Sequence, residues 1–202
     1  MSRRERRKQE IRDRMIEAAV DLFEAQGVGA TRVAEIAERA DVANKTFFNH
    51  FPSKQHLLDE ISRRGLDQLL VDLEDARKHA CTTRERVHYF FEHLAANAAE
   101  VGPMHRDLLT TMIQVSASDD AGEGEQTRKL HDAFGAIVRD GLASGDLSQR
   151  HSPETFTEML MGAFYVLMFN WANLDHYPLR ERALESARFL GDAMTISEEE
   201  RP

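Results

Sequence analysis

Residues 30–54 read ATRVAEIAERADVANKTFFNHFPSK, and this stretch decides the fold. Its first half places apolar residues on one face of a short helix, in front of which Thr31 offers an N-cap hydroxyl. A turn at Asp41-Val42-Ala43 follows, and then a second short helix over 44–51 that Pro52 ends. Two short helices joined by a tight turn form the pattern of a helix-turn-helix.

A longer helix is expected before this stretch. Its apolar face is formed by Ile11, Met15, Ala18, Ala19, Leu22 and Phe23. Gly27 can close the helix as a left-handed C-terminal cap. Phe47 and Phe51 are four residues apart, so both can pack against this helix from one face of the second short helix. The opposite face of the second short helix is then exposed.

That exposed face indicates what the motif binds. It presents Asn44, Lys45, Phe48 and Asn49, with Thr46 and His50 at its flanks, and these polar donors, cation and aromatic edge suit base edges in a DNA major groove. Lys54 is placed for phosphate contact at the start of the next helix. The residues expected to contact DNA are Arg3, Arg4, Thr31, Arg32, Ala43, Asn44, Lys45, Thr46, Phe48, Asn49, His50 and Lys54.

The charge of the chain is divided between two regions. The net charge is −9, which by itself argues against nucleic acid as a partner. Residues 1–65, however, hold 13 basic and 11 acidic residues, a balance of +2, which leaves 13 and 24, a balance of −11, for residues 66–202. Five of the basic residues lie in the first eight positions, where a mobile arm can follow phosphates. The alternative for this basic segment is a solvated, frayed terminus.

The rest of the chain predicts more helices. Strand patterns are nearly absent and apolar residues recur at spacings of three and four, so we expect an all-α protein of about nine helices. A fourth helix over 53–78 would connect the first region to the second. Breaks at Gly, Pro and Ser predict the remaining helices at about 83–100, 104–117, 125–143, 153–174 and 179–195.

Residues 30–54 and their lead-in at 19–27 strongly resemble the DNA-binding segment of the tetracycline-repressor (TetR) family, and the resemblance covers about residues 8–60. Two positions depart from the family pattern in the turn: Asp41 stands where Gly is common, and Ala43 where a small hydroxyl residue is common. Phe48 stands where Tyr is frequent, so a contact there would be apolar.

The resemblance implies a helix-turn-helix DNA-binding domain at 1–52, made of three helices, and a helical effector-binding and dimerisation domain at 53–202. It also implies a transcriptional regulator, most often a repressor, that binds a palindromic double-stranded operator as a homodimer and is released by a small effector. We call the helix-turn-helix domain the head. Two heads related by a two-fold axis would reach major grooves roughly 34 Å apart, which a single head cannot do.

The last two helices are the candidates for the dimer interface. The predicted helix at 153–174 is apolar on almost every side in its middle, so its apolar side chains cannot all face one core. The predicted helix at 179–195 carries a single apolar stripe. The alternative is that both helices pack inside the monomer. The expected interface residues are Met159, Ala163, Val166, Asn170, Leu179, Ala183, Ala187 and Leu190.

An effector site is expected among Met-rich and aromatic positions of the second region. Adaptable methionines with few polar groups suggest a mostly apolar or aromatic small molecule, although such stripes are also typical of plain core. The expected lining is Phe90, Met104, His105, Leu108, Met112, Met161, Phe164, Tyr165, Met168 and Trp171.

Other classes of function have weaker support in the sequence. The histidine spacings match no HExxH helix and no GxSxG elbow is present, so we expect no enzyme, catalytic residue, metal or cofactor. The longest uncharged stretch, Met159–Leu174, is too short to span a membrane, and the single Cys81 fits a cytoplasmic protein. A helical adaptor that binds protein rather than specific DNA is the alternative.

Overall fold

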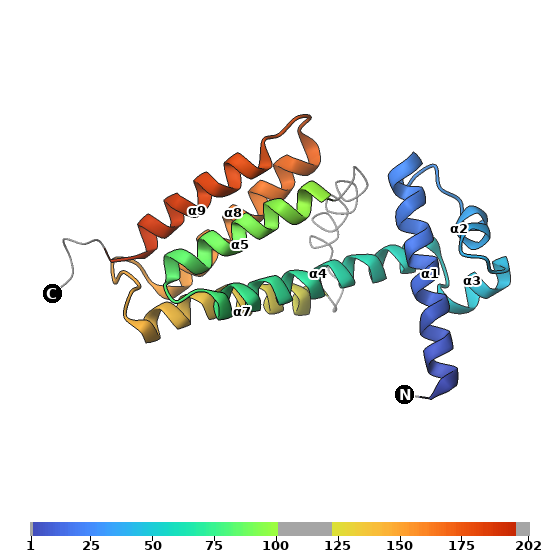
Figure 1. Cartoon of the computed structure of the whole chain (residues 1–202), viewed down its shortest axis with the longest axis horizontal. Coiled ribbons are helices and arrows are strands. Elements are labelled where there is room, and N and C mark those ends of the chain that lie inside the picture. The colour runs from blue at the N-terminus through green and yellow to red at the C-terminus, as the bar shows by residue number, and fades with distance from the viewer. Residues whose placement is uncertain (1, 101–122, 197–202) are drawn as a thin grey trace. The chain divides into compact units, whose positions relative to one another are not determined.

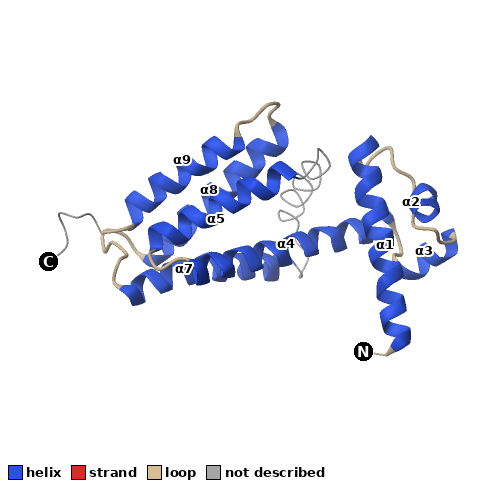
Figure 2. Ribbon diagram, viewed as in Figure 1, coloured by secondary structure: helices blue, strands red, loops and turns tan. Residues whose placement is uncertain are grey.

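The computed structural model describes residues 2–100 and 123–196, and these residues contain eight α-helices (Figure 1). Figure 2 shows these residues as helices joined by loops, as expected for an all-α protein. Of the predicted helices, the one at 104–117 lies outside the described residues. The helices are α1 (Arg3–Gln26), α2 (Val33–Arg39), α3 (Asn44–His50), α4 (Lys54–His79), α5 (Thr83–Glu100), α7 (Glu123–Ser144), α8 (Pro153–Asn173) and α9 (Leu179–Met194).

The described residues form two compact units, one up to Gly65 and the other from Leu66 onward. The division falls within α4, whose first turns belong to the first unit and whose later turns belong to the second. The sequence placed its boundary at residue 52 with 53–78 as a connector, and that functional division stays a prediction.

The first unit has an apolar core shared by α1, α2, α3 and the start of α4. Phe47 and Phe51 are buried in it, as the spacing of four predicted. Gly27 ends α1 with a positive φ of +83°, as predicted, but its ψ of 155° lies outside the left-handed helical region; its N–H donates to the carbonyl of Phe23 over 2.8 Å. Burial of this shared core holds two helices of seven residues each that are too short to be stable alone.

The turn between α2 and α3 is a Schellman motif. The N–H of Val42 donates to Ala37 O over 2.9 Å, and the N–H of Asp41 donates to Glu38 O over 3.0 Å. Asp41 has φ +53°, a conformation that glycine adopts without strain. Ala43 is the N-cap of α3 and makes no side-chain cap hydrogen bond. At position 41 a glycine would adopt the positive φ without strain, and at position 43 a hydroxyl residue could cap α3. The chain has neither residue at these two positions.

Two expectations for the ends of helices were wrong. Thr31 is not the N-cap of α2: Arg32 is, and its N–H donates to the Glu35 carboxylate over 2.8 Å. The basic N-terminal segment is not a mobile arm, because α1 begins at Arg3. Ser2 caps it, accepting a hydrogen bond from the N–H of Glu5.

In the second unit, α5 packs against α9, and α8 packs against α7 and α9. A cluster of buried side chains from these helices and the later turns of α4 forms the core. Ser152 caps α8 as predicted, accepting from the N–H of Thr155 over 3.2 Å, and Pro153 occupies the first turn. Within residues 2–100 and 123–196, no helix combines the length and apolar character needed to cross a membrane.

Candidate nucleic-acid interface

The outward face of α3 is a polar surface built on buried aromatic residues. Asn44, Lys45 and Asn49 are exposed, while Phe47 on the inner face is fully buried. Phe48 is 52% exposed, and its ring meets that of Phe47 edge to face, with 5.5 Å between ring centroids. Phe48 thus rests against the buried ring of Phe47 while half of its surface stays exposed on the outward face of α3.

The two residues that flank this face are half-buried. Thr46 and His50 are intermediate in exposure, and Ala43 in front of them is exposed. Burial lowers the pKa of His50, and the nearby charges of Lys8 and Arg12 lower it further. The His50 imidazole is therefore neutral at neutral pH in the free protein.

Two residues that are expected to contact DNA, Thr31 and Lys54, form hydrogen bonds within the first unit, and their contact with DNA stays a prediction. Thr31 is 1% exposed, and its hydroxyl donates to Gly27 O over 2.9 Å, so it belongs to the folded core of the α1–α2 loop. The Lys54 ammonium donates to the carbonyls of Val28 (2.7 Å) and Thr31 (3.0 Å) in that same loop. Lys54 thus ties the start of α4 to this loop, a role that local sequence could not reveal.

The remaining basic candidates are exposed. Arg32 precedes α2 and forms an ion pair with Glu35 over 2.8 Å, which leaves it at the surface of the first unit. Arg3 and Arg4 lie in the first turn of α1, so their side chains are held on a helix rather than on a flexible arm. Their contact with DNA stays a prediction.

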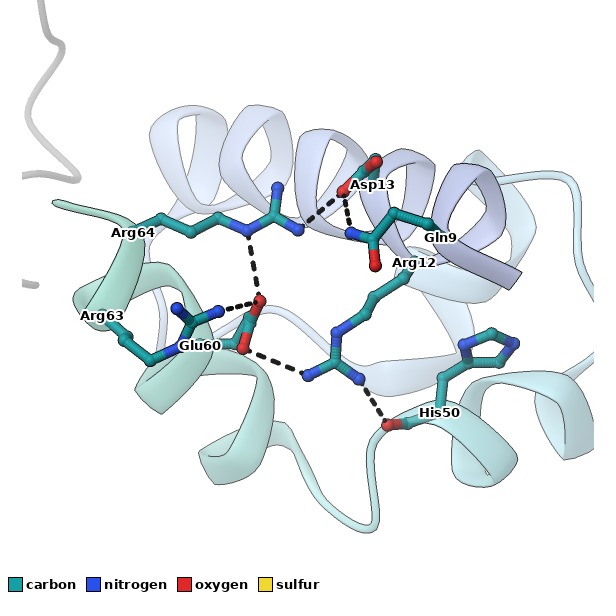
Figure 3. Close-up of polar contacts among 7 residues, drawn as sticks. All are labelled: Gln9, Arg12, Asp13, His50, Glu60, Arg63 and Arg64. Atoms are coloured by element: carbon teal, nitrogen blue, oxygen red, sulfur yellow. Dashed lines mark hydrogen bonds and ion pairs between the residues drawn. The ribbon is translucent and has the colours of Figure 1, made fainter. Parts of the chain in front are cut away.

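A polar network that the sequence analysis missed joins α1, α3 and α4 (Figure 3). The Arg12 guanidinium donates to the carbonyl of His50 (3.0 Å) and to the Glu60 carboxylate (3.2 Å). Glu60 also accepts from Arg63 (2.8 Å) and Arg64 (3.2 Å). The only signal in the sequence was charge on the polar sides of two predicted helices. Such charge does not specify that Arg12 bonds to His50 and Glu60, which lie 38 and 48 residues further along the chain.

Glu60 is the acidic centre of this network. Burial alone would raise the pKa of its carboxyl, but hydrogen bonds from Arg63, Arg12 and Arg64 outweigh burial and hold the pKa below its ordinary value of 4.5. A second acid, Asp13 of α1, accepts from Arg64 over 2.6 Å. The network therefore alternates basic and acidic side chains, and Glu60 at its centre is ionised at neutral pH.

The expected dimer-interface residues separate into two groups. On α8, Met159 and Val166 are 52% and 57% exposed, and Ala163 and Asn170 are half-buried. On α9, the whole predicted stripe is buried in the core of its own unit, which corrects that part of the expectation; the stripe is Leu179, Ala183, Ala187 and Leu190.

The exposed apolar residue of α9 is one that the sequence analysis did not select. Phe189 is 71% exposed, the most exposed of the large apolar side chains among the described residues. It lines a groove of about 620 Å³ together with Met159 and Ala163 of α8. An apolar surface therefore runs across α8 and α9.

The expected effector-site residues in the described chain lie in or against the second core. Phe90, Phe164, Met168 and Trp171 are buried, with 6.4 Å between the ring centroids of Phe90 and Phe164, and Met161 and Tyr165 are half-buried against them. Four further candidates, Met104, His105, Leu108 and Met112, lie outside the described residues. Within residues 2–100 and 123–196, no three His, Cys, Asp or Glu side chains gather as a metal site would require.

Comparison with known proteins agrees with this geometry. Residues 15–61, which contain the helix-turn-helix and the α1 and α4 segments that pack on it, match the family described as bacterial regulatory proteins, tetR family. Residues 15–61 therefore resemble the DNA-binding segment of the tetR family. The match is to a family of regulatory proteins, and the outward face of α3 lies within the matched residues.

Individual relatives extend the similarity beyond the head. The chain is 29% identical over 146 residues to the HTH-type transcriptional repressor KstR of Mycolicibacterium smegmatis, which covers 72% of this chain and 69% of that protein. Its fold matches Thermus thermophilus FadR, a TetR-family repressor solved in complex with lauroyl-CoA. The TM-score is 0.66 at 26% identity, over 95% of this chain and 98% of FadR. Bacillus subtilis FadR, solved in complex with stearoyl-CoA, matches in fold with a TM-score of 0.64 at 20% identity, over 88% and 96% of the two chains.

Proposed function

We propose that this protein is a tetR-family transcriptional repressor that binds a palindromic operator as a homodimer and leaves it when a small, mostly apolar effector binds. The observation that carries the proposal is the outward face of α3. Asn44, Lys45 and Asn49 are exposed there around the ring of Phe48, on a helix whose opposite face is locked into the core. This combination of donors, a cation and an aromatic edge can distinguish base pairs in a major groove.

The apolar surface on α8 and α9 supports the homodimer. Met159, Val166, Phe169 and Phe189 are each at least half exposed, although large apolar side chains at water cost free energy unless they are covered. A second copy of this chain is the occupant we propose, because a two-fold axis through one such surface brings the same residues of both copies together. A two-fold dimer presents two recognition helices and therefore reads a palindrome.

The effector we propose is a long-chain acyl-CoA thioester. The two FadR proteins that share this fold were solved with lauroyl-CoA and stearoyl-CoA, and one of them is 26% identical to this chain. The second unit has an aromatic and Met-rich interior, in which Phe90, Phe134 and Phe164 adjoin one another, and such an interior suits an alkyl chain. Release from the operator follows if the effector binds more tightly to a state of the dimer that does not fit the groove spacing.

The test is selection of bound duplexes from a random pool by the purified full chain, followed by binding to the selected duplex at several salt concentrations. We expect a palindromic duplex whose binding weakens steeply with salt, by roughly 0.9 log units of affinity per log unit of salt for each phosphate neutralised. A pool that does not enrich would overturn the proposal and favour the helical adaptor. Enrichment of a non-palindromic duplex would retain DNA reading and reject the dimeric mode.

A further inference from the structure

Arg12 of α1 connects the carboxyl end of α3 to α4. Its two terminal nitrogens divide between these elements: Nη1 donates to the His50 carbonyl (3.0 Å) and Nη2 to the Glu60 carboxylate (3.2 Å). The guanidinium also lies over the ring of Phe51, with Cζ 4.2 Å from the ring centroid. As Figure 3 shows, Arg12 lies between the last residue of α3 and the first turns of α4.

Apart from the buried rings of Phe47 and Phe51, few contacts hold the ends of α3. The helix is seven residues long and has no side-chain cap at its amino end. At its carboxyl end the last carbonyl, that of His50, points at a guanidinium, a favourable partner for the negative end of a helix. Arg12 therefore adds, to the apolar packing of Phe47 and Phe51, a polar contact that bears on the orientation of the recognition helix.

The position of Arg12 depends in turn on α4. Glu60 accepts from Arg12, Arg63 and Arg64, and Arg64 donates to Asp13 on α1, one residue after Arg12. The Glu60 carboxylate is thus held by charge-assisted bonds from Arg63 and Arg64 in addition to the bond from Arg12. A shift of the first turns of α4 relative to α1 would move the group that orients the end of α3.

We propose that Arg12, held by Glu60, is a positioning residue for operator recognition: it orients the recognition helix through its last carbonyl without touching DNA. This inference rests on the proposed function, because it requires a specific operator. The Arg12–Glu60 pair is then the contact through which a shift of α4 changes the orientation of α3.

The experiment uses two variants of the full chain, Arg12→Lys and Glu60→Gln, and the duplex selected by the wild-type protein. Arg12→Lys retains the charge but loses the planar fork that serves two acceptors and stacks on Phe51. Glu60→Gln makes the head one unit more positive. If charge alone mattered, Arg12→Lys would change nothing and Glu60→Gln would bind all DNA more tightly. Positioning predicts the opposite sign for Glu60→Gln on the operator.

We expect each variant to bind the operator roughly fivefold to tenfold more weakly. Affinity for an unrelated duplex at low salt should be unchanged, or higher for Glu60→Gln. The double variant should lose no more operator affinity than whichever single variant binds the operator more weakly, because both changes remove one shared interaction. Glu17→Gln is the control: it makes the same charge change at an exposed position of α1 and should not weaken operator binding.

Three results would overturn the inference. The first is unchanged operator affinity in both variants. The second is tighter operator binding by Glu60→Gln. The third is an equal loss of operator and unrelated-duplex binding, which would mean that the network serves only the folding of the head. Failure of the proposed function is a separate result, since the wild-type protein would then select no duplex for the comparison.

Discussion

Lys45 and Asn49 are neighbours on the exposed face of α3, four residues apart, and their chemistry predicts different effects on binding. A lysine supplies a point charge to a phosphate, whereas an asparagine amide can donate to and accept from one base edge. The two residues therefore separate the affinity of the head from its specificity.

We expect Lys45→Ala to weaken binding to all duplexes by a similar factor and to lower the salt slope by roughly 0.9. Asn49→Ala should leave the slope unchanged and relax preference at one base pair of each half-site, by about 1–3 kcal/mol of discrimination. Fluorescence anisotropy with the selected duplex and single-base variants of it measures both effects. Loss of preference in Lys45→Ala with an unchanged slope would reverse these assignments.

The lowered pKa of Glu60 predicts how its contribution to stability depends on pH. Because the folded pKa lies below the ordinary value of 4.5, the stabilisation is fully present above that value. It disappears as the pH falls through the folded pKa and the carboxylate takes up a proton. The wild-type protein should therefore be more stable than Glu60→Gln at pH 7, and the difference should shrink below pH 4.5.

Urea unfolding of both proteins between pH 7 and pH 3 checks this prediction. A difference in unfolding free energy that stays constant down to pH 3, or that grows as the pH falls, would contradict it. Titration of carboxylates outside this network affects both proteins equally, so the difference reports on the network around Glu60.

At the scale of elements, α3 lacks a capping side chain because Ala43 occupies its N-cap. Ala43→Ser should supply a hydroxyl to an amide of the first turn and raise the free energy of unfolding by about 0.5–2 kcal/mol. Ala34→Ser is the matched control, since Ala34 is exposed inside α2 and serine there should cost a few tenths of a kcal/mol. Equal effects of the two substitutions in thermal unfolding would show that the cap position has no special role.

The exposed apolar side chains of α8 and α9 give the second prediction at this scale. Val166→Glu and Phe189→Glu should each raise the dimer dissociation constant at least roughly tenfold, because a carboxylate would be buried without a partner at the interface. Both positions are mostly exposed in the chain alone, so its fold should persist. Light scattering after size exclusion checks the mass. Leu142→Glu, at an exposed position of α7, is the control and should leave a dimer.

At the scale of the whole molecule, effector and operator must influence each other reciprocally. If lauroyl-CoA lowers operator affinity by a given factor, the operator must lower the affinity for lauroyl-CoA by the same factor. We expect a factor of roughly ten or more, measured by calorimetry with and without operator, and no effect of CoA without the acyl chain. Lauroyl-CoA binding that is identical with and without operator would contradict the release mechanism.

The sequence by itself determined the helices, the helix-turn-helix and the outward face of α3. These follow from signals that act within a few residues: the 3.6-residue periodicity, Gly27 after α1, Pro52 after α3 and the Ser152 cap. The polar face around Lys45 could be predicted because the opposite side of the same short helix carries Phe47 and Phe51.

Only the tertiary structure decided which partner each surface meets. The apolar stripe of α9 fits equally well against its own chain or a second copy, and packing against α5 and α8 placed it inside. The sequence analysis assigned Lys54 to DNA and did not select Arg12. The groups to which these two side chains donate lie 26 and 23 residues from Lys54, and 38 and 48 residues from Arg12. The physical reason is that a helix pattern specifies a buried face and a polar face, whereas the partner of each side chain depends on elements that folding brings together from distant parts of the chain.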